Sequence, residues 1–109
     1  MKKFFLIISM FLIISCNGEL AKAEINIPTA QCGMCAVTIE NALTKVDGIK
    51  KIKVHMDVLK VTVRYDAEVV DVISIESAIS NVGYQANETS ANAEVYKNLP
   101  GCCKLPADR

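Results

Sequence analysis

The chain has 109 residues, with 12 acidic and 12 basic side chains, and 51% of its residues are hydrophobic. This length suffices for one domain, and the balanced charge argues against a nucleic-acid partner, which would require a strongly basic surface. The sequence also lacks a Ser–His–Asp set, a convergent carboxylate pair and a phosphate-binding loop, so we expect a protein that is not an enzyme.

The N-terminal segment has the features of an export signal. Two lysines precede an apolar run over residues 4–14, which is long enough for the core of a signal peptide and too short to span a bilayer. The run ends in IISC, which resembles the lipobox of bacterial lipoproteins and implies cleavage before Cys16 with lipid attached to that residue. An ordinary secretory signal cut near residues 21–23 is the alternative.

The expected mature chain is exported and lipid-anchored to a bacterial membrane, facing the periplasm or the exterior. It carries 10 basic and 12 acidic residues, a net charge of −2, because Lys2 and Lys3 leave with the signal. Membrane attachment is therefore expected to come from the lipid and not from basic residues.

The first half of the folded region predicts a strand, a helix and a hairpin. Residues 24–29 alternate between polar and apolar side chains and reach Pro28, which predicts a short strand. Apolar residues spaced at i, i+3, i+4 and i+7 predict a helix over residues 33–46; they are Ile39, Ala42, Leu43 and Val46. Two alternating runs, KIKVHM and LKVTVRY, flank a turn near Asp57 and predict an antiparallel hairpin.

The second half completes a known architecture. Asp71 is expected to cap a helix that ends at Gly83, and residues 84–87 are expected to form a last short strand. Strand, helix, two strands, helix and strand is the βαββαβ order of the ferredoxin-like α+β fold, in which a four-stranded antiparallel sheet carries two helices on one face. We predict a signal peptide over residues 1–15, a tether over 16–23, the domain over 24–87 and a tail over 88–109.

The five cysteines carry the chemistry of the chain. With Cys16 assigned to lipid, the remaining thiols form one CxxC pair, Cys32 and Cys35, and one vicinal pair, Cys102 and Cys103. The CxxC pair lies where a loop meets the first helix, and a helix N-terminus favours thiolate over thiol. Two thiolates at this spacing can converge on Cu(I) or Hg(II), whereas Zn(II) requires four ligands.

The order of strand, CxxC, helix, hairpin, helix and GY resembles the heavy-metal-associated domain, a family of copper chaperones, N-terminal domains of metal-pumping ATPases and the mercuric transport periplasmic protein. The matching segments are CGMCAVTIENAL, VTVRYD and AISNVGYQA. The resemblance implies that Cys32 and Cys35 bind the metal ion and that Tyr84 is the aromatic residue of the loop beside it. The family usually has Met two residues before the first cysteine, where this chain has Ala30, and Met34 lies between the cysteines instead.

The vicinal cysteines of the tail are an addition that this domain does not need, although some exported relatives look similar. We expect Cys102 and Cys103 to fold back to the CxxC pair, giving three or four thiolates and extending the range of metals to Zn(II) or Cd(II). Roughly 14 residues separate the domain from Cys102, and an extended chain covers ~3.3 Å per residue, so the tail can reach the site. The alternative is a disulfide within the pair, to the CxxC pair or between chains.

Other side chains are given ordinary roles. His55 shares the polar face of its strand with Lys51 and Lys53, and all three are expected to face water. Met34 and Met56 are expected to pack against the protein and not to bind copper.

The sequence thus predicts a non-enzymatic carrier of a soft metal ion, Cu(I) before Hg(II) or Zn(II). It is expected to scavenge the ion or to pass it by ligand exchange to a membrane metal transporter or a cuproprotein. A second interpretation is a small thiol–disulfide redox protein that uses the same CxxC, and a third is a lipoprotein with structural disulfides and a protein-binding role.

Overall fold

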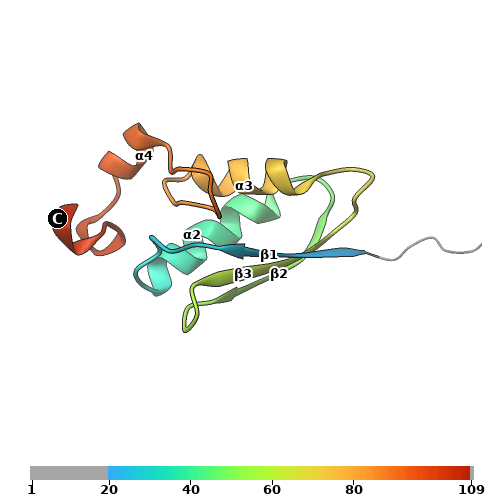
Figure 1. Ribbon diagram of the computed structural model, residues 1–109, viewed down its shortest axis with the longest axis horizontal. Helices are drawn as coiled ribbons and strands as arrows, with labels where there is room; N and C mark the ends of the chain where they lie inside the picture. Colours follow the sequence, from blue (N-terminus) through green and yellow to red (C-terminus); the bar gives the residue numbers. More distant parts are fainter. Residues whose placement is uncertain (1–19, 109) are drawn as a thin grey trace, which may run out of the picture.

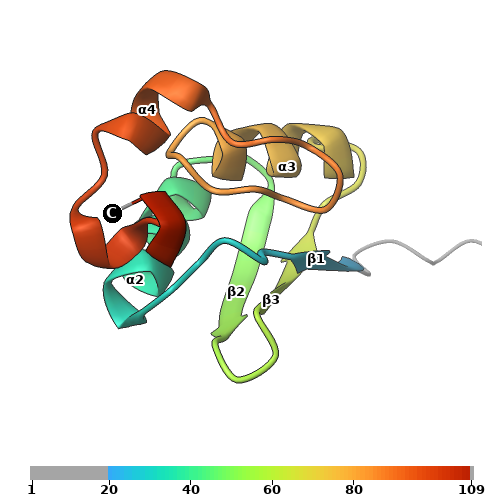
Figure 2. The ribbon, with the colours of Figure 1, turned by 60° about the vertical axis from the view of Figure 1, so that its left-hand side comes forward.

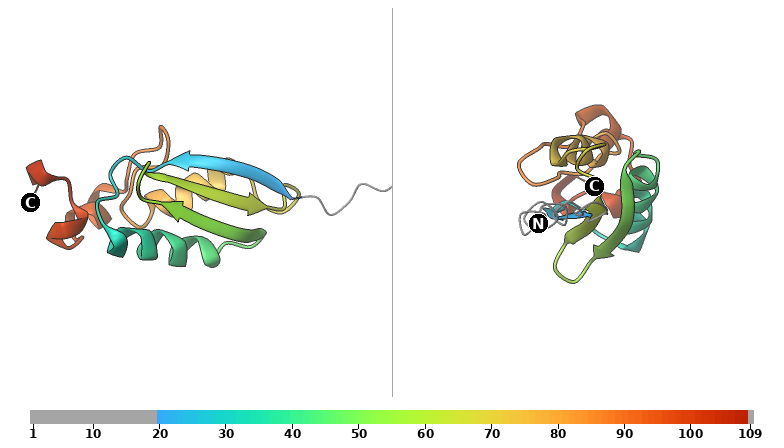
Figure 3. Two further views of the ribbon diagram at one scale, coloured as in Figure 1. Left: turned by 90° about the horizontal axis from the view of Figure 1, so that it is seen from below. Right: turned by 90° about the vertical axis from the view of Figure 1, so that its right-hand side faces the viewer.

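The computed structural model describes residues 20–108; the predicted signal peptide, Cys16 and most of the tether lie outside them. Three strands form an antiparallel sheet in the order β1 (Ala21–Asn26), β3 (Lys60–Tyr65) and β2 (Ile49–His55). Helices α2 (Gly33–Thr44) and α3 (Val72–Ser80) lie on one face of this sheet (Figure 1). Figure 3 shows that the other face is left uncovered.

The core lies between the sheet and the two helices, as the apolar periodicity predicted. Its fully buried side chains come from all three layers: Ile25, Val61 and Val63 from the strands, Ile39 and Leu43 from α2, and Ile75 and Ile79 from α3. Asp71 caps α3, as expected, because its carboxylate accepts a hydrogen bond from the Ser74 backbone N–H at 2.9 Å. The α+β ferredoxin-like class is thereby confirmed.

The sheet differs from the prediction at both of its ends. Strand β1 begins at Ala21, so three residues assigned to the tether pair with β3 instead, with Ala21 opposite Tyr65. The fourth strand is not formed within residues 20–108. Asn87 forms two hydrogen bonds of 2.8 Å with Asn26, one of them through its side chain. Its φ of 52° then turns the chain away from the sheet, and Ala86 instead forms an isolated antiparallel bridge with Thr89.

The C-terminal tail packs back onto the domain. It contains the short helix α4 (Ala93–Lys97) and two 3-10 turns, η2 (Gly101–Cys103) and η3 (Pro106–Asp108). The tail is held to the end of α3, where Ser80 donates a hydrogen bond to the Ser90 carbonyl at 2.6 Å. Figures 1 and 2 both place η2 beside the start of α2. No helix within residues 20–108 is long and apolar enough to cross a membrane.

Gly48, in the turn before β2, tests the packing of this fold. Its φ is +96°, and a Cβ there would lie 2.9 Å from side-chain atoms of Val69 and Val70. We expect Gly48→Ala to lower the free energy of unfolding by about 1–3 kcal/mol, measured by urea denaturation. Gly33→Ala is the matched control, because an added Cβ meets nothing within 4 Å there. An unchanged unfolding midpoint for Gly48→Ala would contradict the described turn.

Candidate metal centre

The CxxC pair lies at the N-terminus of α2, as the sequence predicted. Cys32 is the N-cap residue, with an extended backbone (φ −155°, ψ 176°), and it is partly exposed. Cys35 lies in the first turn and is fully buried. The two sulfur atoms are 3.6 Å apart. Both side chains therefore face the same small region between α2 and the tail.

The backbone at the helix start favours the thiolate form of Cys32. Hydrogen bonding from the Cys35 amide, the largest effect, lowers the pKa of Cys32 to about 7, assisted by the Cys35 thiol, the Met34 amide and the Cys102 thiol, and opposed by desolvation. The N–H groups of a first helical turn all point toward the helix start and favour an anion placed there. The lowered pKa makes Cys32 a ready nucleophile and metal ligand.

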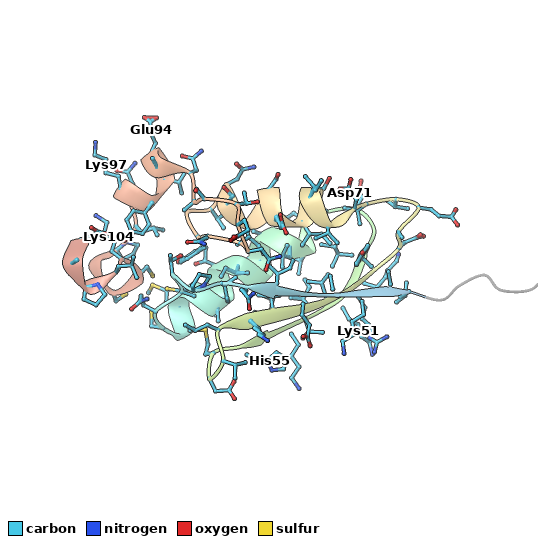
Figure 4. All side chains as sticks on the ribbon, viewed as in Figure 1. Lys51, His55, Asp71, Glu94, Lys97 and Lys104 are labelled. Atoms are coloured by element: carbon cyan, nitrogen blue, oxygen red, sulfur yellow. The ribbon has the colours of Figure 1, made fainter. Side chains whose placement is uncertain are left out.

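The tail brings its two cysteines to the same place. The sulfur atoms of Cys32, Cys102 and Cys103 all lie within 4.8 Å of one another, and those of Cys102 and Cys103 are 3.9 Å apart. Cys102 is exposed, whereas Cys103 is buried. Side-chain sulfur atoms can be seen gathered between the start of α2 and the tail in Figure 4. All four cysteines within residues 20–108 are free thiols in this arrangement.

Tyr84 lies on the buried side of the thiol cluster. Its side chain is fully buried, and its hydroxyl has no hydrogen-bond partner among the described residues. The hydroxyl faces the thiols of Cys35 and Cys103; burial, followed by these neighbours, raises the pKa of Tyr84. Burial, with a contribution from Cys35, also raises the pKa of Cys103 to about 12. Tyr84 and Cys103 are therefore uncharged until a metal or another group displaces a proton.

Known protein families include one that matches this chain. The family model for the heavy-metal-associated domain matches residues 24–85, more than half of the chain. The chain belongs to the heavy-metal-associated domain family. This is a family of metal-binding domains without enzymatic activity, so both the predicted family and the predicted absence of catalysis are confirmed.

Similar proteins include carriers of two metals. The chain is 34% identical over 80 residues to the mercuric transport protein periplasmic component of Shewanella putrefaciens, covering 72% of this chain and 88% of that protein. It is 35% identical over 65 residues to the copper chaperone CopZ of Enterococcus hirae, covering 60% and 94%. Among solved structures, the Cu(I)-loaded N-terminal domain of a potential copper-translocating P-type ATPase from Bacillus subtilis superposes with a TM-score of 0.60 and 31% identity over 62% of this chain and 85% of that one.

The opposite pKa shifts in this heavy-metal-associated domain predict a fixed order of thiol reactivity. In the metal-free, reduced protein, Cys32 should be alkylated well before Cys103. Because the pKa of Cys32 is lowered, its thiolate persists as the pH falls toward about 7 and is lost below that value, and the alkylation rate should fall with it. Mass spectrometry of iodoacetamide-treated protein across pH measures this order. Cys103 reacting first at neutral pH would contradict the described burial.

The structure corrects one expected role and supports others. Met34 was expected to pack, but its side chain is 55% exposed, because the second residue of α2 points away from the sheet. Met56 packs against the core as predicted. His55 lies outside the thiol cluster, and its Nε2 lies 3.3 Å from the Thr62 hydroxyl, so it is partly held by the neighbouring strand.

Sequence reasoning missed the position of the Tyr84 hydroxyl. The GY motif identified Tyr84 as an aromatic residue of the loop, but its contact with Cys103 depends on the path of the tail. That path rests on side-chain packing such as that of Leu99 over Gly83, where an added Cβ would lie 3.1 Å from Leu99 Cδ1. The hydroxyl of Tyr84 was the one signal in the sequence that a polar group lies on this aromatic ring.

Proposed function

We propose that this heavy-metal-associated domain binds one soft metal ion in a closed thiolate site formed by Cys32, Cys35, Cys102 and Cys103. The observation that carries the proposal is the convergence of the Cys32, Cys102 and Cys103 sulfur atoms within 4.8 Å, from segments about 70 residues apart in the chain. Thiolates are soft ligands that select thiophilic ions. The scattered surface acids of the chain offer no comparable group among the described residues.

The sulfur spacings support three or four ligands over a linear pair. A metal–sulfur bond of ~2.3 Å gives sulfur–sulfur distances of ~3.8 Å in a tetrahedral site and ~4.6 Å in a linear one. The observed distances are 3.6 Å for Cys32–Cys35 and 3.9 Å for Cys102–Cys103. Cys32, Cys102 and Cys103 therefore approach trigonal coordination, and Cys35, 3.6 Å from Cys32 but outside that group of three, would have to shift to become a fourth ligand. A linear ion would require the CxxC sulfurs to separate.

Cu(I) is the first candidate for the cargo, and Hg(II) and Zn(II) follow. Copper and mercury are the metals named for the similar proteins, and four thiolates would also meet the demand of Zn(II). The protein would scavenge the ion or hand it to a membrane metal transporter or a cuproprotein. In the transfer an incoming thiolate adds to the ion, and then one of the protein thiolates leaves; the exposed Cys102 is the accessible one.

We further propose that this exchange takes place outside the cytoplasmic membrane. The relative from Shewanella putrefaciens is a periplasmic component. The apolar run over residues 4–14 and the IISC that follows support export and lipid attachment at Cys16. The domain, whose first strand begins at Ala21, would then carry the tail over residues 88–109 as part of its metal site.

Counting the sulfur ligands around the bound ion tests this function. X-ray absorption of the reduced protein loaded with one equivalent of Cu(I) should show three or more sulfur neighbours at a single metal distance. Two sulfur neighbours at the shorter distance of a linear site would contradict the participation of Cys102 and Cys103 and leave a CxxC-only carrier.

One observation favours a second candidate, a thiol–disulfide redox protein. Cys32 is partly exposed, has a pKa lowered to about 7 and lies 3.6 Å from a second thiol, which are features of an attacking cysteine. Reductase activity toward a small disulfide, together with a reduction potential in the range of catalytic dithiols, would support this function. Tight metal binding that blocks Cys32 under reducing conditions would argue for the carrier.

A further inference from the structure

The uncovered face of the sheet concentrates positive charge. The strand register places Lys22 of β1, Arg64 of β3 and Lys51 of β2 side by side in one row across the sheet. Lys53 and Lys60 lie on the same face in the next two rows, and Glu24 is its only carboxylate. Their strand neighbours on the other face, such as Ile25 and Val63, are buried in the core. Figure 4 shows Lys51 and His55 directed away from the helices. We call these five cations the basic face.

The basic face also has the shape to receive anionic groups. Lys51, Lys53, Thr62 and Arg64, together with Ile52, line an open hollow of about 280 Å³. The Thr62 hydroxyl and the His55 ring, in contact at 3.3 Å, border this region. Cations and a hydroxyl around a shallow hollow can contact phosphate oxygens without enclosing a free ligand.

The charged residues are unevenly distributed, although the net charge of the chain is near zero. Within residues 20–108, the basic face holds five of nine Lys and Arg residues, and the rest of that region has four cations and ten acids. A charge distribution this asymmetric orients a protein toward a surface of opposite charge.

We propose that the basic face rests on an anionic lipid bilayer. The six residues 15–20 separate the apolar run over residues 4–14 from β1 and span at most ~20 Å when extended, so either the run or a lipid at Cys16 would anchor the chain close to the start of this sheet. The face carries no Tyr, Phe or Trp on which nucleic-acid bases could stack. The thiol cluster lies at the start of α2, on the helix side of the sheet, and remains open to a partner when the basic face is covered (Figure 4).

Vesicle binding of the full chain tests this proposal. Sedimentation with phosphatidylcholine vesicles, with and without phosphatidylglycerol, gives the ratio of binding to anionic over neutral lipid. The apolar run and the N-terminal lysines contribute equally in every variant. A change in the ratio between two variants therefore reports only the lysine charges that were removed. We expect Lys51→Gln/Lys53→Gln to lower the ratio roughly twentyfold, since each cation near an anionic surface contributes about fivefold. The control is Lys45→Gln/Lys97→Gln, which removes two cations from helix ends and should change the ratio less than about threefold.

An unchanged ratio in Lys51→Gln/Lys53→Gln, or an equal loss in the control pair, would overturn the proposal. Displacement of the protein from vesicles by inorganic phosphate, beyond that caused by chloride at equal ionic strength, would also overturn it. So would stronger binding to an oligonucleotide than to anionic vesicles. The basic face does not depend on the proposed function. Copper stoichiometry measured on the same variants separates the two, because the metal site and the vesicle ratio can each fail while the other stands.

Discussion

Replacing both Cys32 and Cys35 with serine is expected to abolish tight binding of Cu(I) by this protein. The change removes the thiol of Cys32, whose pKa is lowered to about 7, and the Cys35 sulfur 3.6 Å from it. The remaining pair consists of an exposed Cys102 and a Cys103 whose pKa is raised to about 12, so a metal must displace a tightly held proton to bind there. A four-thiolate site is worth on the order of 10 kcal/mol or more, so losing half of its ligands should cost at least about 10³-fold in affinity.

Competition with a Cu(I) chelator under anaerobic conditions measures this loss. Met34→Leu is the control, because Met34 lies between the two cysteines but is largely exposed, and it should leave the affinity within a few-fold of the unaltered protein. A double-serine variant that still competes as well as the unaltered protein would place the metal elsewhere.

Replacing Cys102 and Cys103 with serine should separate a closed site from a CxxC-only site. We expect Zn(II) and Cd(II) binding to disappear, because two thiolates leave the four-ligand preference of Zn(II) unmet. Cu(I) should still bind, at least about tenfold more weakly, since two coordinating sulfurs are enough for this ion but fewer thiolates hold it. Competition titrations for each metal provide the measurement.

Gly101→Ala is the matched control for the tail. Gly101 belongs to the same turn as the two cysteines, and an added Cβ meets nothing within 4 Å. The control should keep the affinity for all three metals. If the double-serine variant also keeps its affinities and its stoichiometry, the two tail thiols are not ligands.

The CxxC and its helix were predictable because their signals are local. The apolar spacing of residues such as Ile39 and Leu43 set the helix, and its start set the positions of Cys32 and Cys35. For the tail, the sequence showed only that the chain is long enough to reach the CxxC pair. Its path depends on side-chain contacts between distant segments, including Leu99 with Gly83, that no local pattern encodes.

Other features required the three-dimensional register. The last strand was expected from YQAN, but the positive φ of Asn87 turns the chain away after two hydrogen bonds with Asn26 of β1. Lys22 was assigned to a tether, so its alignment with Arg64 and Lys51 across three strands could not be anticipated. Alternation had placed Lys51 and Lys53 on a polar face; pairing with β1 and β3 makes that face a concentrated patch of charge.

Anaerobic titration of the reduced protein with Cu(I) and Zn(II) against a competing chelator tests the central claim most directly. Bound metal is counted, and the thiols that remain open to alkylation are identified. A closed thiolate site predicts one tightly bound ion per chain that protects Cys32, Cys35, Cys102 and Cys103 together. Protection of the CxxC pair alone would contradict the closed site, and failure of both ions to survive competition, with ready oxidation of Cys32 and Cys35 to a disulfide, would contradict the metal carrier altogether.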